Sequence, residues 1–567
     1  MGVETRARRD SRVVAGLAQL AGYNTGWFRA DALAGITVTA YLVPQCLAYA
    51  ELAGAPPISG LWVAVIGMLV YALLGTSRLL SVGPESATAI MVAAAVAPLA
   101  AGDPARYLAL SAGVALLVGA VCLGAFVLRL GFVSDLLSMP ILVGYMAGVA
   151  VIMIASQLGT LAGVDLTASG TVGKIAELAG RLDEAHGVTL ALGAAVVAFL
   201  FVLRWRWPLA PGSLLAVIGS GALVALFGLE AQGIALVGAV PSGLPAPAVP
   251  ALGLEDVMAL IGPAAAITFV GYSDVALTGR AFAARNGETI DPNREFLALG
   301  AANVAAGLTG GFALSASGSR TAIVDAMHAR SQLAGMVAAV ATVVVVLAVP
   351  GLIALIPRAT LGGIVVYAAW RLIDMGGIRR LWRFRSSELG LAVAAFAGVL
   401  LFDVLAGILF AIALSVAELF VRVARPPASV LGRVPGLAGL HNIEDYPDAE
   451  QIPGLLVFRY DAPLCFANAQ DFRSRALAAV DQQPVPVQWF LLNSEAIVEL
   501  DLTAADALRE LTEDLEDLGI VFAMARVKQD LRTQLARGGL LGIIDEERMY
   551  PTLPTAVEAF EAWRDRG

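Results

Sequence analysis

The sequence predicts an all-α membrane domain of many spans, followed by a small soluble α/β domain. Of the 567 residues, 58% are hydrophobic and only 15% are charged, whereas an ordinary soluble domain is about 25% charged. Apolar runs of the ~20 residues that cross a bilayer recur from Asp31 to about Arg425. After Pro426 and Pro427, strand-like and helix-like segments alternate instead.

The membrane domain is expected to span residues 29–425. The 59 glycines suit this prediction, because small residues let helices approach closely within a bilayer. Fourteen apolar runs of helical length are predicted as spans, with boundaries at 32–50, 61–75, 85–100, 107–128, 136–161, 188–203, 212–228, 257–278, 295–308, 319–329, 333–349, 360–373, 388–402 and 404–423. The runs that begin near Glu85 and Ser319 are too short to span alone.

Residues 1–28 are predicted to form a cytosolic N-terminal segment without a removable signal peptide. This segment carries several arginines but no short apolar region followed by a small-residue cleavage site. If the N-terminus is cytosolic, most basic loop residues fall on the cytosolic side, namely Arg78, Arg129, Arg204, Arg206, Arg280, Arg285, Arg294, Arg330, Arg371, Arg379, Arg380, Arg383 and Arg385. The opposite side holds Arg106, Lys174, Arg181 and Arg358. This asymmetry obeys the positive-inside rule and supports both the span count and the orientation.

The chain is expected to continue through a linker, 426–452, into a cytosolic α/β domain, 453–567. Strands are predicted at 455–460, 487–492 and 520–523, and helices at 469–480, 504–517 and 529–537. Such alternation predicts a small sheet covered by helices. The domain is cytosolic because it follows an even number of spans.

The scarce histidines and cysteines give no sign of a metal, cofactor or disulfide site. They lie far apart in the chain, without CxxC or HExxH spacing, at Cys46, Cys122, Cys465, His186, His328 and His441. No GxxxxGK[ST] loop is present. We therefore expect neither an enzyme nor a nucleic-acid-binding protein. The net charge of −9 comes from the acidic C-terminal region and does not indicate the sign of a substrate.

Two broken helices predict an anion site at the middle of the membrane. Residues 81–88 read SVGPESAT and residues 315–321 read SASGSRT, and both place small residues before a helix start. They precede spans three and ten, which correspond if seven spans repeat as seven. In many carriers such paired helix starts point their N–H groups at an anion. The alternative is that these small residues only permit close helix packing.

Three side chains in the first span and the tenth could complete this site. Pro44 interrupts the first span and is tolerated only where a cavity or neighbour satisfies the freed carbonyl. Gln45 and Tyr49 share a face beside it, and could line the pocket or bond a neighbouring helix. The charge of Arg320 costs free energy at membrane depth, so it is expected to face the anion site, although Arg320 could also be a cytosolic anchor.

Intramembrane acids are candidates for ion coupling. Asp274 shares a helical face with Thr278, and its carboxylate could take a proton or coordinate sodium. Its alternative role is an ion pair with Arg320. Glu85 would repel an anion unless protonated, which makes it a second candidate for proton coupling.

These segments together resemble the SulP family of sulfate permeases, called solute carrier family 26 in animals, from about Arg29 to Ala562. The matching motifs are DALAGITV (31–38) with PQ (44–45), GAPP (54–57) before GL (60–61), GTSR (75–78) before SVGP (81–84), NREFLALG (293–300) with Asn303, and SRT (319–321) before QLAG (332–335). The pattern is most similar to the actinobacterial branch.

The resemblance implies two inverted seven-helix repeats, a core domain that moves against a gate domain, and a C-terminal STAS domain. It places the anion site between the starts of spans three and ten. The substrate-binding residues carried over are Gln45, Tyr49, Glu85, Ser86, Ala87, Ser319 and Arg320, to which the segment 315–321 itself adds Ser317 and Gly318. Asp274 and Thr278 match the cation site of sodium-coupled bicarbonate members.

Two positions depart from the family pattern. Glu85 stands where many relatives carry an apolar or aromatic residue, which affects the charge of the pocket. Leu502 replaces the serine of the phosphorylation motif in stand-alone STAS proteins, so we expect no such phosphoregulation.

The expected function is secondary active transport of a small inorganic anion, with sulfate as the first expectation. We expect the transport to be coupled to protons and to proceed by elevator-like alternating access. Alternatives are a sodium-coupled bicarbonate carrier and a dicarboxylate or chloride carrier. A third class of function, a membrane scaffold for a signalling domain, leaves the paired broken helices unexplained. The resemblance also implies a homodimer in the inner (plasma) membrane, with the STAS domain in the cytoplasm.

Overall fold

The structure is a computed structural model that describes residues 23–132, 138–168, 170–208, 210–238 and 247–566, together with Gly16 and Pro245 and without the side chains of Asp403 and Ile408. The predicted N-terminal segment 1–28 therefore lies mostly outside the described residues. The chain forms two compact units, Met1–Ser415 and Val416–Gly567.

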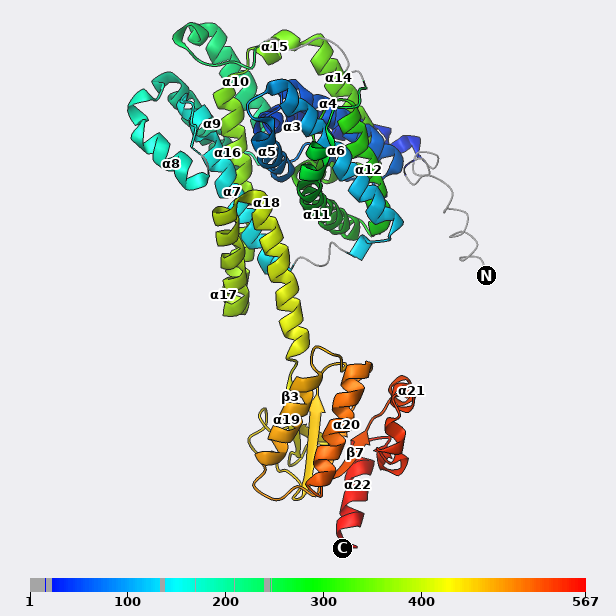
Figure 1. The fold of residues 1–567 in the computed structure, drawn as a ribbon. Helices are drawn as coiled ribbons and strands as arrows, with labels where there is room; N and C mark the ends of the chain where they lie inside the picture. The colour runs from blue at the N-terminus through cyan, green and yellow to red at the C-terminus, as the bar shows by residue number, and fades with distance from the viewer. Residues whose placement is uncertain are drawn as a thin grey trace. The chain divides into compact units, whose positions relative to one another are not determined.

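The first unit is built almost wholly of helices, coloured from blue to yellow-green in Figure 1. Among the described residues, eight helices are long and apolar enough to cross a membrane, and four further apolar helices are shorter. The predicted runs match α3 (Phe28–Leu52), α4 (Pro57–Leu74), α5 (Ser86–Ala100), α6 (Pro104–Val127), α7 (Met139–Ala162), α9 (Gly187–Arg206), α10 (Gly212–Phe227), α11 (Leu254–Arg285), α12 (Pro292–Leu308), α13 (Gly318–Ala326), α14 (Leu333–Ala348), α16 (Arg358–Leu372) and α18 (Ser386–Ala424). The count of fourteen spans stays a prediction.

The two halves of this unit interleave. Helix α12 packs on α6 and α4, and α14 packs on α3 and α4, so helices from both halves form one group. Helix α16 packs on α7 and α9 in a second group, and it also contacts α3. Space between α3, α7 and α16 therefore lies between the two groups.

Glycines allow the closest helix contacts. At Gly60 an added Cβ would lie 2.0 Å from the carbonyl oxygen of Cys46, and at Gly144 it would lie 1.9 Å from that of Ala392. No side chain fits there, so helix α4 touches α3, and α18 touches α7, backbone to backbone. Such close contacts at small residues are typical of helices that pack against each other within a membrane.

Helix α18 folds back on itself. A Cβ at Gly407 would lie 2.7 Å from the Cα of Val399, whereas eight residues along a straight helix are about 12 Å apart. The predicted runs 388–402 and 404–423 are therefore two packed arms joined by a sharp bend.

Three short helices were not predicted: α8 (Thr171–Gly180), α15 (Pro350–Ala354) and α17 (Met375–Phe384). They lie in connections and are too short or too polar to resemble spans. Helix α13 ends at Ala326, earlier than the predicted 329, and His328 just beyond has a φ of +57°.

A two-stranded antiparallel ribbon joins the two broken segments. Strands β1 (Val82–Gly83) and β2 (Ser315–Ala316) pair with Val82 opposite Ala316. Gly83 leaves room for Arg320, because a Cβ there would lie 3.3 Å from Nη2 of that arginine. Each strand leads into a helix, α5 after β1 and α13 after β2.

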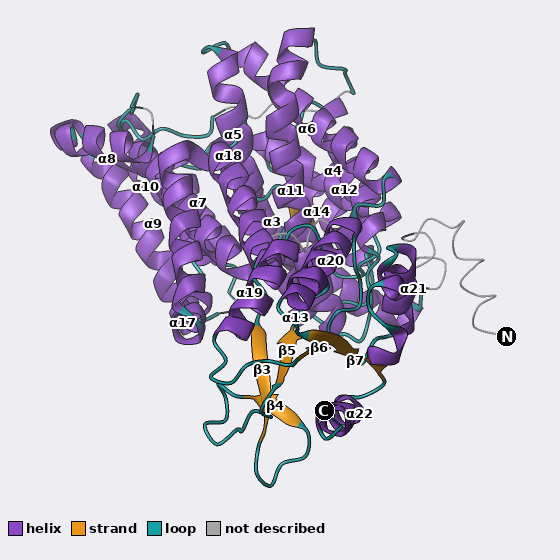
Figure 2. Ribbon diagram, turned by 60° about the horizontal axis from the view of Figure 1, so that its bottom comes forward, coloured by secondary structure: helices purple, strands orange, loops and turns teal. Residues whose placement is uncertain are grey.

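The second unit contains a six-stranded sheet of order β4-β3-β5-β6-β7-β8, shown in orange in Figure 2. Strands β5 (Leu455–Tyr460), β6 (Trp489–Asn493), β7 (Val521–Ala525) and β8 (Met549–Tyr550) run parallel. The three strands predicted in this unit match β5, β6 and β7, and the three predicted helices match α19 (Ala469–Asp481), α20 (Leu502–Asp517) and α21 (Gln529–Arg537).

Helices cover both faces of the sheet. Phe458, Phe490 and Phe522 point to the face packed by α19, α20 and α21. Leu491 and Ala523 point to the other face, where α22 (Leu553–Arg564) packs through Phe560. The alternation follows the two-residue period of a strand.

The segment 426–452, expected as a linker, contributes two strands. Strand β3 (Ala428–Arg433) pairs antiparallel with β5, and β4 (Leu440–Asn442) pairs with β3 at the sheet edge. The buried residues of β3 are Ser429, Leu431 and Gly432, and β4 has three residues, so neither strand shows a long apolar run.

Candidate functional site

A cavity of about 270 Å³ lies between the two helix groups of the first unit. Ten of the eleven site residues expected from the sequence line it: Gln45, Tyr49, Glu85, Ser86, Ala87, Asp274, Thr278, Ser317, Gly318 and Ser319. They come from α3, α5, α11 and α13, and from the residues just before α5 and α13. The structure therefore brings together positions up to 274 residues apart in sequence.

The ribbon of β1 and β2 positions both helix starts at this cavity. The Ser317 amide donates to the Ser81 carbonyl at 2.9 Å, and the Ser81 amide donates to the Thr321 hydroxyl at 3.1 Å. These two bonds tie the segment before α5 to the start of α13. The pairing is antiparallel, as expected for two segments related by inverted topology.

The start of α13 offers free backbone donors. Ser317 caps the helix by accepting from the Arg320 amide at 3.4 Å. Within the described part of the chain, the amides of Gly318 and Ser319 have no hydrogen-bond acceptor. Both residues line the cavity, and free N–H groups at a helix N-terminus form a ready anion site.

The start of α5 differs from the expectation of free donors. Its own Glu85 is the N-cap residue and accepts from the Ala87 amide at 2.7 Å and from the Ser86 hydroxyl at 2.6 Å. A carboxylate thus occupies the place that an anion would take. The sequence identified Glu85 as an acid at the site, but the inward turn of its side chain depends on the backbone at the helix start.

Arg320 does not line the cavity. Its side chain is fully buried, and it donates to the Pro84 carbonyl at 3.0 Å and to the Ser81 hydroxyl at 3.3 Å. The remaining nitrogen, Nη2, has no partner among the described residues. In this structure the guanidinium group therefore holds β1 and lies beside the site, and it does not reach solvent as a surface anchor would.

Asp274 and Thr278 face the start of α13. A Cβ at Gly318 would lie 3.6 Å from the Thr278 hydroxyl oxygen, so α11 and α13 are close at this point. No ion pair joins Asp274 to Arg320 within the described residues. The carboxylate is thus available to the cavity.

The polar side chains of α3 close another side. Pro44 lies inside this helix, and Gln45 and Tyr49 follow it into the cavity lining. The Gln45 Oε1 atom is buried without a partner among the described residues. Since the two ends of an amide can exchange places, this side chain can present either an acceptor or N–H donors to a bound ion.

Helices α7, α10 and α16 contribute lining residues that sequence reasoning missed, among them Met146, Ser213, Tyr367 and Arg371. The Pro-Gly pair before Ser213 at the start of α10 could have indicated a site, whereas the other three residues lie within continuous helices. Arg371 was assigned to a basic cytosolic loop, although it is still within α16. Among the lining residues it supplies the positive charge, against the two carboxylates of Glu85 and Asp274.

Comparison with known proteins gives a consistent result. A model described as the sulfate permease family matches residues 28–395, and a STAS domain model matches residues 446–556. A probable sulfate transporter of Mycobacterium tuberculosis is 54% identical over 546 residues, which cover 96% of this chain and 97% of that protein. High affinity sulfate transporter 2 of Stylosanthes hamata is 27% identical, with 95% and 85% covered.

Solved structures share the fold. The murine solute carrier 26 family member A9 anion transporter, in the inward-facing state, matches with a TM-score of 0.89 and 21% identity, covering 97% of this chain and 94% of that one. The transmembrane domain of a cyanobacterium bicarbonate transporter matches with a TM-score of 0.61 and 24% identity, covering 68% of this chain and 98% of that domain.

Proposed function

The chain belongs to the sulfate permease family of membrane transporters, and we propose that it carries sulfate across the membrane by proton-coupled secondary active transport. It is a multi-pass membrane protein with a C-terminal STAS domain and is not an enzyme. The substrate proposal is supported by the 54% identity to the mycobacterial probable sulfate transporter.

The observation that carries the proposal is the convergence of two helix starts on one cavity. Free amides of Gly318 and Ser319 face it from α13, and the hydroxyls of Ser317 and Thr278 line it. Amide and hydroxyl donors suit an oxyanion, because every sulfate oxygen accepts hydrogen bonds. Arg320 adds a positive charge behind the ribbon.

The charges of the lining favour coupling to a cation. With Glu85 and Asp274 ionised, they outweigh the single charge of Arg371 and oppose a divalent anion. Uptake of a proton by either carboxylate removes that opposition, so proton and anion binding would assist each other reciprocally. Asp274 with Thr278 could hold sodium in the same way, which is the rival coupling ion.

Further proposals concern architecture and orientation. Fourteen spans form two inverted repeats, with a core group around α5 and α13 that moves against a gate group around α7 and α16. The antiparallel pairing of β1 and β2 supports this arrangement. The positive-inside pattern supports a cytoplasmic N-terminus and STAS domain in the inner membrane. A homodimer is expected from the family.

Uptake of radiolabelled sulfate into vesicles containing the purified protein tests the proposal. We expect an inward proton gradient to stimulate uptake, and we expect Asp274→Asn to lose that stimulation. Asp256→Asn is the matched control, because Asp256 lies on the same helix but pairs with Arg106 at 2.9 Å. Absence of sulfate flux together with sodium-dependent bicarbonate flux would replace the proposal with the bicarbonate alternative.

A further inference from the structure

A second cavity, of about 430 Å³, lies farther along α3, α7 and α16, three of the helices that line the first cavity. Helix α16 contributes Arg358 to it but Tyr367 and Arg371 to the first cavity. Helix α7 likewise contributes Thr160 to the second and Met146 to the first. Fourteen residues of α7 correspond to about 21 Å along a helix. The two cavities thus lie at different depths between the same two helix groups.

Close helix packing separates the cavities in this structure. A Cβ at Gly362 would lie 3.3 Å from Gln157 Oε1 and 3.3 Å from a methyl group of Thr160. Helices α16 and α7 therefore touch between the two spaces. An anion in the second cavity would reach the first only when these helices move apart.

Arg358 and Lys174 both line the second cavity, together with the carboxylates of Glu51 and Asp165. Arg358 begins α16, and its amide is fixed by the Ala235 carbonyl at 2.9 Å. Lys174 lies on α8 and has no ion-pair partner among the described residues. These are two of only four basic residues predicted on the non-cytosolic side. Their convergence on one cavity is therefore notable, since that side is otherwise poor in positive charge.

The carboxylate opposite Arg358 is only partly satisfied. Glu51, at the end of α3, places Oε1 3.8 Å from Nε of Arg358, which is long for an ion pair. Its Oε2 is buried and has no partner among the described residues. Arg358 itself is 54% exposed. The guanidinium group thus has donors left for another anion, and Glu51 competes for them.

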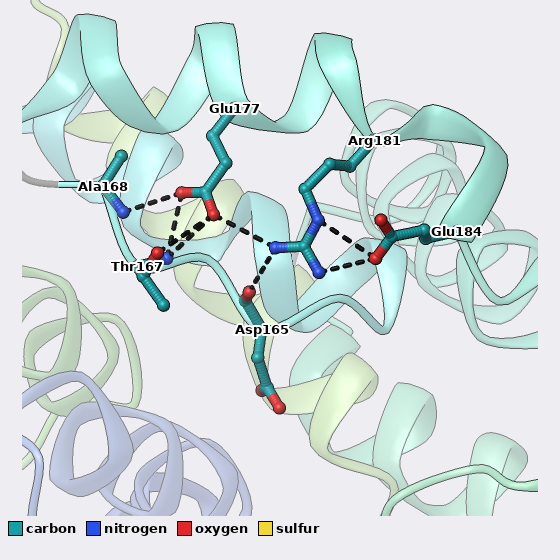
Figure 3. Close-up of polar contacts among 6 residues, drawn as sticks. All are labelled: Asp165, Thr167, Ala168, Glu177, Arg181 and Glu184. Carbon is teal, nitrogen blue, oxygen red and sulfur yellow. Dashed lines mark hydrogen bonds and ion pairs between the residues drawn. The ribbon is translucent and has the colours of Figure 1, made fainter.

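The loop after α7 and helix α8 both contribute to the lining of this cavity, and hydrogen bonds join them to each other (Figure 3). Glu177 of α8 accepts from the Thr167 amide at 2.9 Å and from the Ala168 amide at 2.7 Å, and Arg181 donates to the Asp165 carbonyl at 2.9 Å. These bonds fasten the loop after α7 to the helix that carries Lys174. The Glu177 and Arg181 side chains therefore fix the backbone of α8 beside the cavity.

We propose that this second cavity is an anion-binding site on the non-cytosolic side, in which Arg358 and Lys174 hold an incoming oxyanion before it enters the transport path. Glu51 occupies Arg358 when the anion is absent. The inference rests on the proposed function, because it assigns a further binding step to the same transported oxyanion.

Initial rates of sulfate uptake in oriented vesicles test this site. We expect Arg358→Gln and Lys174→Gln each to raise KM about twofold to fivefold, as expected for loss of one partly exposed charge contact, with little change in kcat. The effect should occur only when sulfate is supplied on the non-cytosolic side. Arg106→Gln is the matched control, since Arg106 is 50% exposed and paired, but does not line the cavity.

Glu51→Gln separates an anion site from a simple latch. If Arg358 binds the anion, removing its competitor should lower KM, opposite to the effect of Arg358→Gln. If the pair only holds the helices together, both variants should shift KM in the same direction, and the inference would be wrong. Values equal to the Arg106→Gln control would also overturn it, while sulfate transport by the unmodified protein would leave the proposed function intact.

Discussion

Removal of the Glu85 charge should strengthen sulfate binding. In the structure this carboxylate caps α5 by accepting from the Ala87 amide at 2.7 Å and from the Ser86 hydroxyl at 2.6 Å. Gln at this position keeps an acceptor oxygen for the cap but carries no charge. Glu85→Gln therefore removes repulsion while costing the helix at most about 1 kcal/mol.

The expected magnitude follows from the charges. A carboxylate and a dianion about 6 Å apart repel by about 5.5 kcal/mol at an effective permittivity of 20, and by about 1.4 kcal/mol at that of water. Because the cavity is open to water in part, we take the lower value as the firm expectation. It corresponds to an approximately tenfold lower Kd for sulfate.

Sulfate binding to the purified protein at neutral pH, measured by calorimetry, gives this Kd directly. Glu288→Gln is the control, since Glu288 pairs with Arg78 at 3.3 Å and does not line the cavity. Equal or weaker binding by Glu85→Gln, at unchanged thermal stability, would refute the idea that Glu85 opposes the anion.

Three further predictions concern positioning and stability. Asn303→Ala should lower kcat and destabilise the protein by about 2–4 kcal/mol. The side-chain amide of Asn303 accepts from the Leu314 backbone amide at 3.0 Å and donates to the Leu314 carbonyl at 3.1 Å, directly before β2. Transport and thermal unfolding are the measurements, and unchanged values would contradict this prediction. Glu295→Ala should destabilise the protein by about 3–5 kcal/mol, since this fully buried carboxylate accepts from the Tyr71 hydroxyl at 2.7 Å and the Thr76 amide at 2.9 Å. The free energy of unfolding in denaturant, measured beside the Glu288→Gln variant, checks this prediction. Hydrogen bonds from the Ala168 and Thr167 amides, and then from Arg181, hold the pKa of Glu177 below its ordinary value. The stability that the loop gains is therefore complete above the unfolded-state pKa near 4.3 and is lost as the pH falls through the lowered folded-state pKa. Amide exchange at Thr167 should show this loss, and Glu177→Gln should abolish the pH dependence.

Much of the fold was predictable because each signal is local. Apolar runs located most helix ends to within about four residues, although α11 continues to Arg285, beyond its predicted run 257–278. The alternation after Pro426 located three strands of the second unit. The edge strands β3 and β4 escaped, since they depend on pairing with β5 for their stability. The boundary between the predicted runs 388–402 and 404–423 indicated where α18 bends, but the packing of its two arms depends on the contact of Gly407 with Val399.

The candidate site was predictable where the backbone is broken. Glycine and proline before α5 and α13 indicated the two helix starts, and the rare acids indicated Asp274 and Glu85. Arg371 was missed because it lies within the continuous helix α16, and Ser213 was missed because the start of α10 approaches the site only in the tertiary structure. The inward turn of Arg320 toward Pro84, instead of toward the cavity, likewise depends on the pairing of β1 with β2.

The central claim, that the start of α13 binds the transported anion, is tested most directly by sulfate binding to a variant that fills this space. A Cβ at Gly318 would lie 3.6 Å from the Thr278 hydroxyl oxygen, so the methyl groups of Gly318→Val would occupy the cavity between α11 and α13. Gly219→Val is the control, because a Cβ at Gly219 meets nothing within 4 Å. We predict that Gly318→Val binds no sulfate while Gly219→Val binds as the unmodified protein does; equal binding by both folded variants would contradict the account.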